Sequence, residues 1–183
     1  MKRNFALPVF AAAALMASVL ISTPSTFAHA TAASTASRIA VNGKVNGEVV
    51  YCQHWRVQLH GESAATGTCL DNQGSKAGAT PDLSNRYPCN TDDVHLWQDT
   101  GGEGASICFY NTGSVNLADW RINIFVTWDN QASSWYSGRW SGVFYPGSND
   151  QGVGQTFSAN QGISNFNCHT VCNDDLSSMK ITG

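Results

Sequence analysis

A six-residue pattern rich in oxygen-bearing side chains occurs twice in the second half of this chain. The first copy is Asp-Asn-Gln-Ala-Ser-Ser at 129–134, and the second is Asn-Asp-Asp-Leu-Ser-Ser at 173–178. Each copy has two Asn or Asp residues, two variable residues and then two serines. The copies lie 44 positions apart, about the length of one Greek-key unit, so the pattern predicts two related structural halves.

The side chains of both copies suit a hard cation. Ca²⁺ takes about six to eight oxygen ligands from carboxylates, amides, hydroxyls, backbone carbonyls and water. One copy offers too few ligands, but two copies facing each other across a pseudo-two-fold axis could complete each other's sites. The alternative is that Asn, Asp and Ser only form turns between strands.

The composition favours short strands joined by tight turns. Charged residues make up 13% of the chain, and Gly, with 17 residues, is frequent. No stretch after residue 30 has the spacing of an amphipathic helix. We therefore expect an all-β fold with strands near 49–51, 55–59, 94–97, 106–110, 122–128, 141–145, 155–158 and 178–181.

Glycine-rich segments indicate where the chain divides. The strongest breaker is Gly101-Gly102-Glu103-Gly104, and we predict a domain boundary there. Residues 71–92 contain several Gly and Pro and predict a long loop held by Cys69 and Cys89. The expected organisation is a signal peptide at 1–30, a flexible segment at 31–47, a β-rich extension at 48–104 and a Greek-key domain at 105–183. Within that domain, the stretch from Phe144 to Ile181 is interpreted as a second copy of the unit that starts near Ile107.

The N-terminus has the pattern of a secretory signal peptide. Met1-Lys2-Arg3 is basic, an apolar run reaches about Ile21, and small residues end at Ala28-His29-Ala30. A membrane anchor is the alternative, but the run is short and contains Pro8. Cleavage after Ala30 or Ala28 is expected, which makes the product secreted, with no membrane insertion.

Charge narrows the expected partners. Loss of Lys2 and Arg3 from the ten basic residues leaves eight against thirteen acidic ones, a formal charge of −5. Nucleic acids and anionic membranes bind basic surfaces, so neither is an expected partner.

The six cysteines predict disulfide bonds. An even number in an exported chain indicates a disulfide framework, although six cysteines allow fifteen pairings. Zinc is disfavoured because Cys168-His169-Thr170-Val171-Cys172 has no second ligand pair at finger-like spacing. The cysteines are Cys52, Cys69, Cys89, Cys108, Cys168 and Cys172.

The paired hexapeptides resemble the calcium motifs of βγ-crystallin domains. The stretch from Gly154 through Phe166 to Ser178 is similar to small exported bacterial members of that superfamily. These include the group that resembles the actinobacterial metalloproteinase inhibitors. The resemblance covers roughly Ile107 to Thr182, and it implies two Greek-key motifs forming a βγ-crystallin-type sandwich with two calcium sites at one end.

The resemblance also implies the ligands. In the family, each site takes the backbone carbonyl at the third motif position and the hydroxyl at the fifth. A side chain from the second position of the other motif completes the site. One site would therefore use Gln131, Ser133 and Asp174, and the other Asp175, Ser177 and Asn130. The neutral Asn130 implies weak or unequal calcium binding, nearer the roughly 10⁻⁴–10⁻³ M range of extracellular modules.

Catalytic motifs are not recognisable in the sequence, which contains neither H-E-x-x-H nor G-x-S-x-G, so we expect a non-enzymatic protein. Three alternatives remain. One is a peptidase (metalloproteinase) inhibitor that presents the 71–92 loop to an extracellular protease. The others are a toxin or antimicrobial protein and a carbohydrate-binding protein that recognises a cell-surface glycan. The last gains faint support from 69–98, which resembles one repeat of a ricin-type β-trefoil, a fold that needs three.

Four tryptophans lie close together in the second half of the chain. They are either core residues or an exposed stacking face for a sugar or a protein. They are Trp120, Trp128, Trp135 and Trp140.

Overall fold

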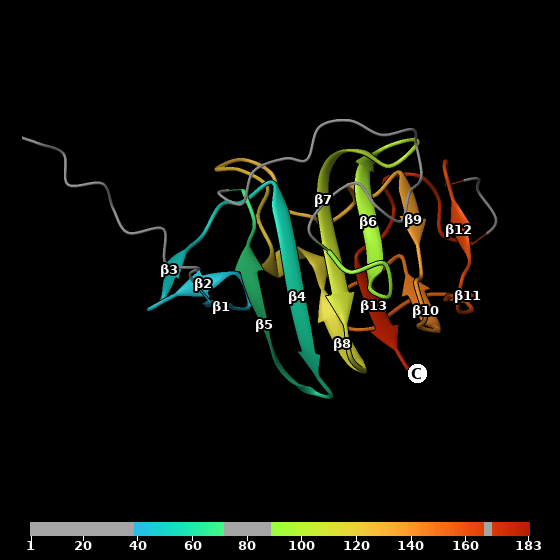
Figure 1. The fold of residues 1–183 in the computed structure, drawn as a ribbon, viewed down its shortest axis with the longest axis horizontal. Coiled ribbons are helices and arrows are strands. Elements are labelled where there is room, and N and C mark those ends of the chain that lie inside the picture. Colours follow the sequence, from blue (N-terminus) through green and yellow to red (C-terminus); the bar gives the residue numbers. More distant parts are fainter. Residues whose placement is uncertain (1–38, 72–88, 167–169) are drawn as a thin grey trace, which may run out of the picture. The chain divides into compact units, whose positions relative to one another are not determined.

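The computed structural model describes residues 39–71, 89–166 and 170–183 (Figure 1). The predicted signal peptide and most of the predicted 71–92 loop lie outside these ranges. The described strands are β1 (Ile39–Val41), β2 (Lys44–Val45), β3 (Glu48–Val49), β4 (His54–His60), β5 (Ser63–Cys69), β6 (Val94–Asp99), β7 (Glu103–Tyr110), β8 (Gly113–Asn116), β9 (Ser134–Tyr136), β10 (Gly142–Tyr145), β11 (Gln155–Phe157), β12 (Gly162–Ile163) and β13 (Ser178–Ile181). A short 3-10 turn, η1 (Leu117–Asp119), follows β8.

The strands form two sheets, which confirms the predicted all-β fold. One sheet has the order β12-β9-β6-β7-β4-β5-β1-β2-β3, and the other has the order β11-β10-β13-β8 (Figure 1). All pairings are antiparallel except that of β4 with β7, which is parallel.

Two Greek-key units are built from the last eight strands. The first unit is β6 to β9 and the second is β10 to β13. In each unit the third strand crosses to the other sheet: β8 pairs with β13, and β12 pairs with β9. This exchange ties the two units into one sandwich, as the resemblance implied.

The first unit begins earlier in the chain than predicted. Gly101 and Gly102 form the turn of the β6–β7 hairpin, and β6 and β7 are hydrogen-bonded neighbours. The predicted boundary at 104/105 therefore falls inside a Greek key, and the unit starts at Val94 rather than near Ile107. Gly101 and Gly102 have φ angles of 74° and 75°, so this glycine-rich turn reflects hairpin geometry and not a linker.

The predicted strand at 122–128 is wrong. This segment is a loop that turns back on itself, because the Asn123 side chain satisfies the backbone. Its Oδ1 accepts hydrogen bonds from Phe125 N at 2.8 Å and Val126 N at 3.0 Å. Ile122 N donates to the Val126 carbonyl at 2.9 Å, which closes the turn. An Asn side chain that competes for backbone donors overrides the β-propensity of the apolar residues around it.

The segment before residue 104 is not a separate extension, because it continues the larger sheet. β4 pairs with β7, and β5 and β1 follow outward. Residues 39–47, expected to be flexible, include β1 and β2. Ala40 is fully buried, and Asn42 exchanges two 3.0 Å hydrogen bonds with the Ala65 backbone.

Two disulfides fix this part of the sheet, confirming that cysteines pair. The bonds are Cys52–Cys69 and Cys89–Cys108. The pairing, which the sequence left open, joins Cys69 to Cys52 and Cys89 to Cys108. Cys168 lies outside the described residues.

The core is aromatic at both ends of the sandwich. Trp135 packs against Phe144, Phe157 and Phe166, with ring centroids between 5.1 and 6.3 Å from its own. Trp55 and Trp120 meet edge to face at 5.1 Å.

β5 was not predicted from the sequence because its inward residues are small. At Gly67, a Cβ would lie 2.3 Å from the Trp120 ring.

Candidate functional site

The two hexapeptides occupy equivalent places in the two Greek keys. Residues 129–134 lead into β9 and residues 173–178 lead into β13, the fourth strand of each unit. The second residue of each loop has a left-handed backbone, with φ of 55° at Asn130 and 56° at Asp174. Asn and Asp tolerate this conformation better than other side chains, so the sequence pattern is explained locally by the turn it must make.

Each loop is completed by the other. The Ser133 hydroxyl donates to Asp174 Oδ1 at 3.3 Å, and the Ser177 hydroxyl donates to Asn130 Oδ1 at 3.2 Å. The fifth position of one loop therefore meets the second position of the other in both directions. The sequence resemblance implied the same residue pairs as calcium ligands, a role that stays a prediction.

The backbone follows the same symmetry. Asn130 N donates to the Leu176 carbonyl at 3.0 Å, and Asp174 N donates to the Ala132 carbonyl at 3.2 Å. Ala132 and Leu176, at the fourth position, are fully buried and anchor the loops in the core. The two loops therefore form one crossed unit, which we call the paired loops (129–134 and 173–178).

The oxygens of the paired loops lie at the boundary between core and solvent. The side chains of Asn130 and Asp174 are exposed, whereas Ser133 and Ser177 are buried, at 6% and 5% exposure. At the third position, Gln131 and Asp175 are half-buried. Their side chains do not take part in the crossed hydrogen bonds. Their backbone carbonyls are the expected calcium ligands at this position, and that role stays a prediction.

The first residue of the first loop adds an unexpected feature. Asp129 Oδ1 is buried and has no hydrogen-bond partner. A buried carboxylate oxygen without a partner is unfavourable by a few kcal/mol unless a cation or a water satisfies it. Asp129 belongs to the motif but was not among the expected ligands.

The last serine of each loop holds a hairpin, a role that the sequence analysis did not assign. Ser134 Oγ donates to the Asp99 carbonyl at 2.7 Å and accepts from Gly102 N at 3.1 Å. These groups lie at the β6–β7 turn. The only sequence signal for this role was the repetition of Ser at the sixth position.

Ser178 does the same in the second unit. Its hydroxyl donates to the Gly147 carbonyl at 2.5 Å and accepts from Asp150 N at 2.9 Å. Both groups belong to the connection between β10 and β11. Each motif therefore connects the paired loops to the first hairpin of its own Greek key.

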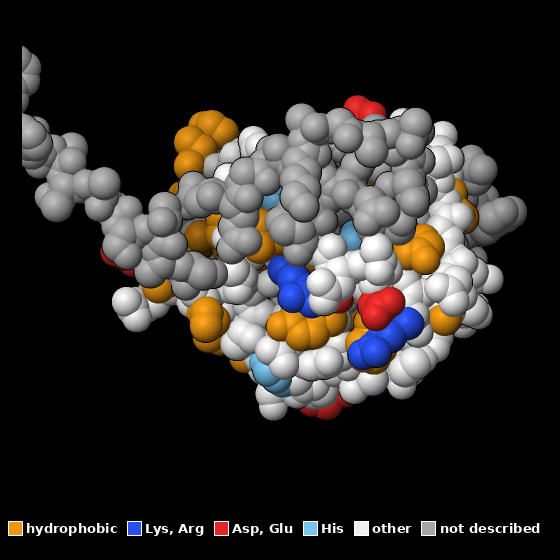
Figure 2. Space-filling model, viewed as in Figure 1, with side chains coloured by type: hydrophobic (Ala, Val, Ile, Leu, Met, Phe, Trp, Pro, Cys, Tyr) orange, Lys and Arg blue, Asp and Glu red, His pale blue; other side chains and the backbone are white. Residues whose placement is uncertain are grey.

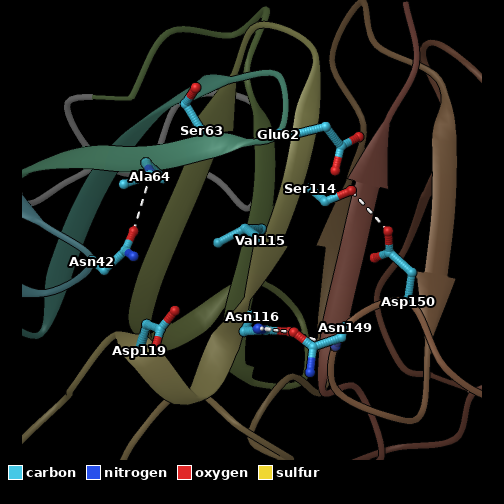
Figure 3. A pocket seen from close by; sticks show the side chains of 11 residues that line it. Asn42, Glu62, Ser63, Ala64, Ser114, Val115, Asn116, Asp119, Asn149 and Asp150 are labelled. Atoms are coloured by element: carbon cyan, nitrogen blue, oxygen red, sulfur yellow. Dashed lines mark hydrogen bonds between the residues drawn. The ribbon is translucent and has the colours of Figure 1, made fainter.

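The β10–β11 connection lines a polar cavity of about 330 Å³, where two hydrogen bonds hold it against β8 (Figure 3). Ser114 Oγ donates to Asp150 Oδ2 at 2.8 Å, and Asn116 Nδ2 donates to Asn149 Oδ1 at 2.8 Å (Figure 3). Asn149 and Asp150 both have left-handed backbones. The hydrogen bond from Ser114 in β8 gives Asp150 a structural role. The residues around this cavity are Asn42, Glu62, Ser63, Ala64, Ala65, Ser114, Val115, Asn116, Asp119, Asn149 and Asp150.

Two further groups of side chains lie close enough together to hold a metal ion, but their atoms are not suitable ligands. Each combines a disulfide with an aspartate: Cys52, Cys69 and Asp71 in one, and Cys89, Asp93 and Cys108 in the other. Sulfur atoms in a disulfide are not thiolates, so they do not serve as ordinary metal ligands. Asp93 instead pairs with Arg56 at 2.8 Å.

Four titratable groups among the described residues have shifted pKa values, and burial is the main cause for three of them. The hydrogen bond to Asp93 raises the pKa of the fourth, Arg56. Desolvation lowers the pKa of His95, whose Nε2 lies 2.9 Å from the Asn90 carbonyl. Burial also lowers the pKa of His54, against a smaller opposing effect of Asp71. Burial raises the pKa of Asp119, and Lys44 opposes that rise. None of these groups belongs to the paired loops.

The tryptophans are core residues and not a stacking face. Trp120 and Trp128 are fully buried, and Trp135 is nearly so. Trp140 is half-buried beneath Arg139, whose guanidinium carbon lies 4.7 Å from the ring centroid. Among the four, none offers an exposed ring to a sugar.

In the residues that the structure describes, no helix has the length and apolar character needed to cross a membrane. The two disulfides indicate an oxidising compartment.

No protein-family model matches this chain, and no curated protein does. Several solved βγ-crystallin domains are similar to about half of it. A double mutant of a βγ-crystallin domain from Clostridium beijerinckii is 23% identical, with a TM-score of 0.38, and the match covers 49% of this chain and 94% of that one. The N-terminal domain of protein S is 14% identical, with a TM-score of 0.39, and covers 50% of this chain and 96% of its own. Hahellin, a βγ-crystallin, is 19% identical, with a TM-score of 0.36, and the match covers 50% of this chain and 91% of hahellin. These values describe likeness only, and the two Greek keys rest on the strand pairings of the chain itself.

Proposed function

We propose that this chain is a secreted, non-enzymatic module of βγ-crystallin type whose paired loops bind calcium as structural ions. One observation carries the proposal. Each buried serine hydroxyl lies within 3.3 Å of an Asn or Asp oxygen supplied by the other loop. Turns alone need no such crossing, because an Asx or Ser turn is satisfied within its own loop.

The donors present fit calcium chemistry. The Ser133 hydroxyl, the Asp174 carboxylate and the Gln131 carbonyl would hold one ion. The Ser177 hydroxyl, the Asn130 amide oxygen and the Asp175 carbonyl would hold the other. All are hard oxygen ligands, and the exposure of Asn130 and Asp174 leaves room for water to complete about six to eight ligands.

A bound ion would strengthen the junction between the two Greek keys. The paired loops join at four hydrogen bonds, two from side chains and two from the backbone. An ion at each crossing would bind the folded state and not the unfolded chain, so it would add stability by mass action. An ion or a water beside the first loop would also satisfy the unpartnered Asp129 oxygen.

The two sites should differ in affinity. One contains the Asp174 carboxylate, whereas its counterpart contains the neutral amide of Asn130. Ligand charge is a main determinant of calcium affinity, so the Asp174 site should bind more tightly, with both near the weak range of extracellular modules.

Thermal unfolding of the protein in calcium and in chelator tests the proposal. For a dissociation constant of about 1 mM, about 10 mM calcium should stabilise the fold by about 1.4 kcal/mol. That stabilisation corresponds to a rise in Tm of roughly 3–6 °C for a domain of this size. The double variant Ser133→Ala with Ser177→Ala should lose this rise, whereas exposed Ser158→Ala should keep it. Equal Tm values in calcium and chelator for the unsubstituted protein would refute the proposal.

Secretion is the second part of the proposal. It is supported by the N-terminal signal pattern and by disulfides that indicate an oxidising compartment.

A further inference from the structure

Exposed hydrophobic side chains gather at one end of the nine-stranded sheet. Among the described residues, six of the seven large hydrophobic side chains that are exposed belong to β1, β3, the residue Tyr51 and the 122–127 loop; the seventh is Val153 in the β10–β11 connection. Figure 2 shows hydrophobic side chains standing out from the surface at this end. The six residues are Ile39, Val41, Val49, Tyr51, Ile124 and Phe125.

The loop brings the most exposed of these residues to the sheet end and holds them there. Phe125 is 87% exposed and Ile124 is 60% exposed. The Asn123 side-chain oxygen closes the turn, because it accepts hydrogen bonds from Phe125 N at 2.8 Å and Val126 N at 3.0 Å. Arg121, at the base of the loop, forms a parallel bridge with Tyr51 and accepts a 3.0 Å hydrogen bond from Cys52 N. Two bulky apolar residues are therefore presented on a rigid turn.

The same end carries the open edge of the sheet. Among the described strands, β3 is the terminal strand of the nine-stranded sheet and pairs on one side only, with β2. The two residues of β3, Glu48 and Val49, leave a short open edge with one charged and one apolar side chain, both exposed. We define β1, β2, β3, Tyr51 and the 121–127 loop as the apolar end.

The charges of the apolar end favour a second copy over other partners. Within it, Lys44 and Arg121 are opposed by Glu48. Asp119, just outside it in η1, lines one shared hollow with Lys44 and Arg121, which brings the local charges into balance. The whole chain has a formal charge of −3. The net negative charge makes like copies repel each other, whereas the balanced charges at this end do not oppose their approach. A polyanion or an anionic membrane finds no net basic face there.

We propose that the apolar end is a self-association surface, at which a second copy of this chain pairs along β3 and packs around Ile124 and Phe125. Edge-to-edge pairing satisfies the open backbone groups of β3, and packing removes the apolar tip from water. A symmetric interface also suits the balanced charges, because Lys44 of one copy can approach Glu48 of the other. The proposal is independent of calcium.

Sedimentation velocity of the purified protein in chelator tests the proposal, at concentrations from about 1 µM to about 1 mM. A concentration-dependent dimer is expected. Phe125→Ser should weaken it by about tenfold or more, since burial of one large apolar side chain contributes about 1.5–3 kcal/mol. Val49→Lys should weaken it similarly by charging the edge. The matched control is Val153→Ser, because Val153 is 75% exposed but lies outside the apolar end; its dimer should be unchanged.

These variants change exposed side chains, and near-ultraviolet circular dichroism verifies that each remains folded. A protein that is monomeric throughout the concentration range overturns the proposal. So does a dimer that is insensitive to both Phe125→Ser and Val49→Lys, or one that Val153→Ser weakens as strongly as they do.

Discussion

The serine at the end of each paired loop should be among the most stabilising polar side chains of the fold. Ser134 is fully buried and bonds to both sides of the β6–β7 turn: its hydroxyl donates to Asp99 O at 2.7 Å and accepts from Gly102 N at 3.1 Å. Ser134→Ala removes this hydroxyl without adding bulk. The carbonyl of Asp99 then loses a donor, and the N–H of Gly102 loses an acceptor.

The expected loss follows from these two bonds. Removing a partner from a buried backbone group destabilises a protein by about 1–3 kcal/mol, so two bonds to one hydroxyl give about 2–6 kcal/mol. For a domain of this size, that corresponds to a decrease in Tm of roughly 4–24 °C. Ser178→Ala should lose a similar amount, because Ser178 makes the equivalent pair of bonds at 2.5 and 2.9 Å.

Urea unfolding followed by tryptophan fluorescence measures this loss. The matched control is Ser158→Ala, because Ser158 is exposed, and surface substitutions usually change stability by less than about 0.5 kcal/mol. If Ser134→Ala were no more destabilising than Ser158→Ala, the hydroxyl would not hold the hairpin. The description of the sixth motif position as a structural anchor would then be wrong.

Two further perturbations follow from burial and backbone geometry. Desolvation lowers the pKa of His95 below 6.5 in the folded state, so the unfolded chain binds the proton more readily. The free energy of unfolding should therefore fall as the pH is lowered through about 6.5 towards the folded-state pKa. Urea titrations between about pH 5 and 8 measure this slope, and His95→Gln should reduce it. Gly138→Ala should be much more destabilising than Gly101→Ala: both glycines have positive φ, but only at Gly138 would a Cβ lie 2.4 Å from the Asp92 backbone, so equal losses of Tm would contradict the described contact.

The repeat was the feature that sequence reasoning could use best. The motif and its resemblance grouped Ser133 with Asp174 and Ser177 with Asn130 as calcium ligands. The structure places each pair within hydrogen-bond distance, and their role as ligands stays a prediction. Alternating apolar residues also predicted β4, and short runs of strand-forming residues predicted β6 and β7. These signals are local or strictly periodic, which is why a single sequence carries them.

Other features depend on contacts between distant segments. β5 contains small residues because Gly67 faces Trp120, and nothing local marks it as a strand. The 122–128 segment has strand-like residues, but Asn123 turns it into a loop. The glycines at 101–104 look the same in a linker and in a hairpin, and only the pairing of β6 with β7 distinguishes the two.

The central claim is that the crossed loops are calcium sites, and calorimetric titration of chelator-stripped protein with calcium tests it most directly. We expect heat that fits two unequal sites with dissociation constants near about 10⁻⁴–10⁻³ M. Ser133→Ala and Ser177→Ala should each remove mainly one site, and Asn130→Asp should tighten the weaker one by adding a carboxylate. Absence of heat at millimolar calcium in the unsubstituted, folded protein would mean that the paired loops are only a structural crossing held by their own hydrogen bonds.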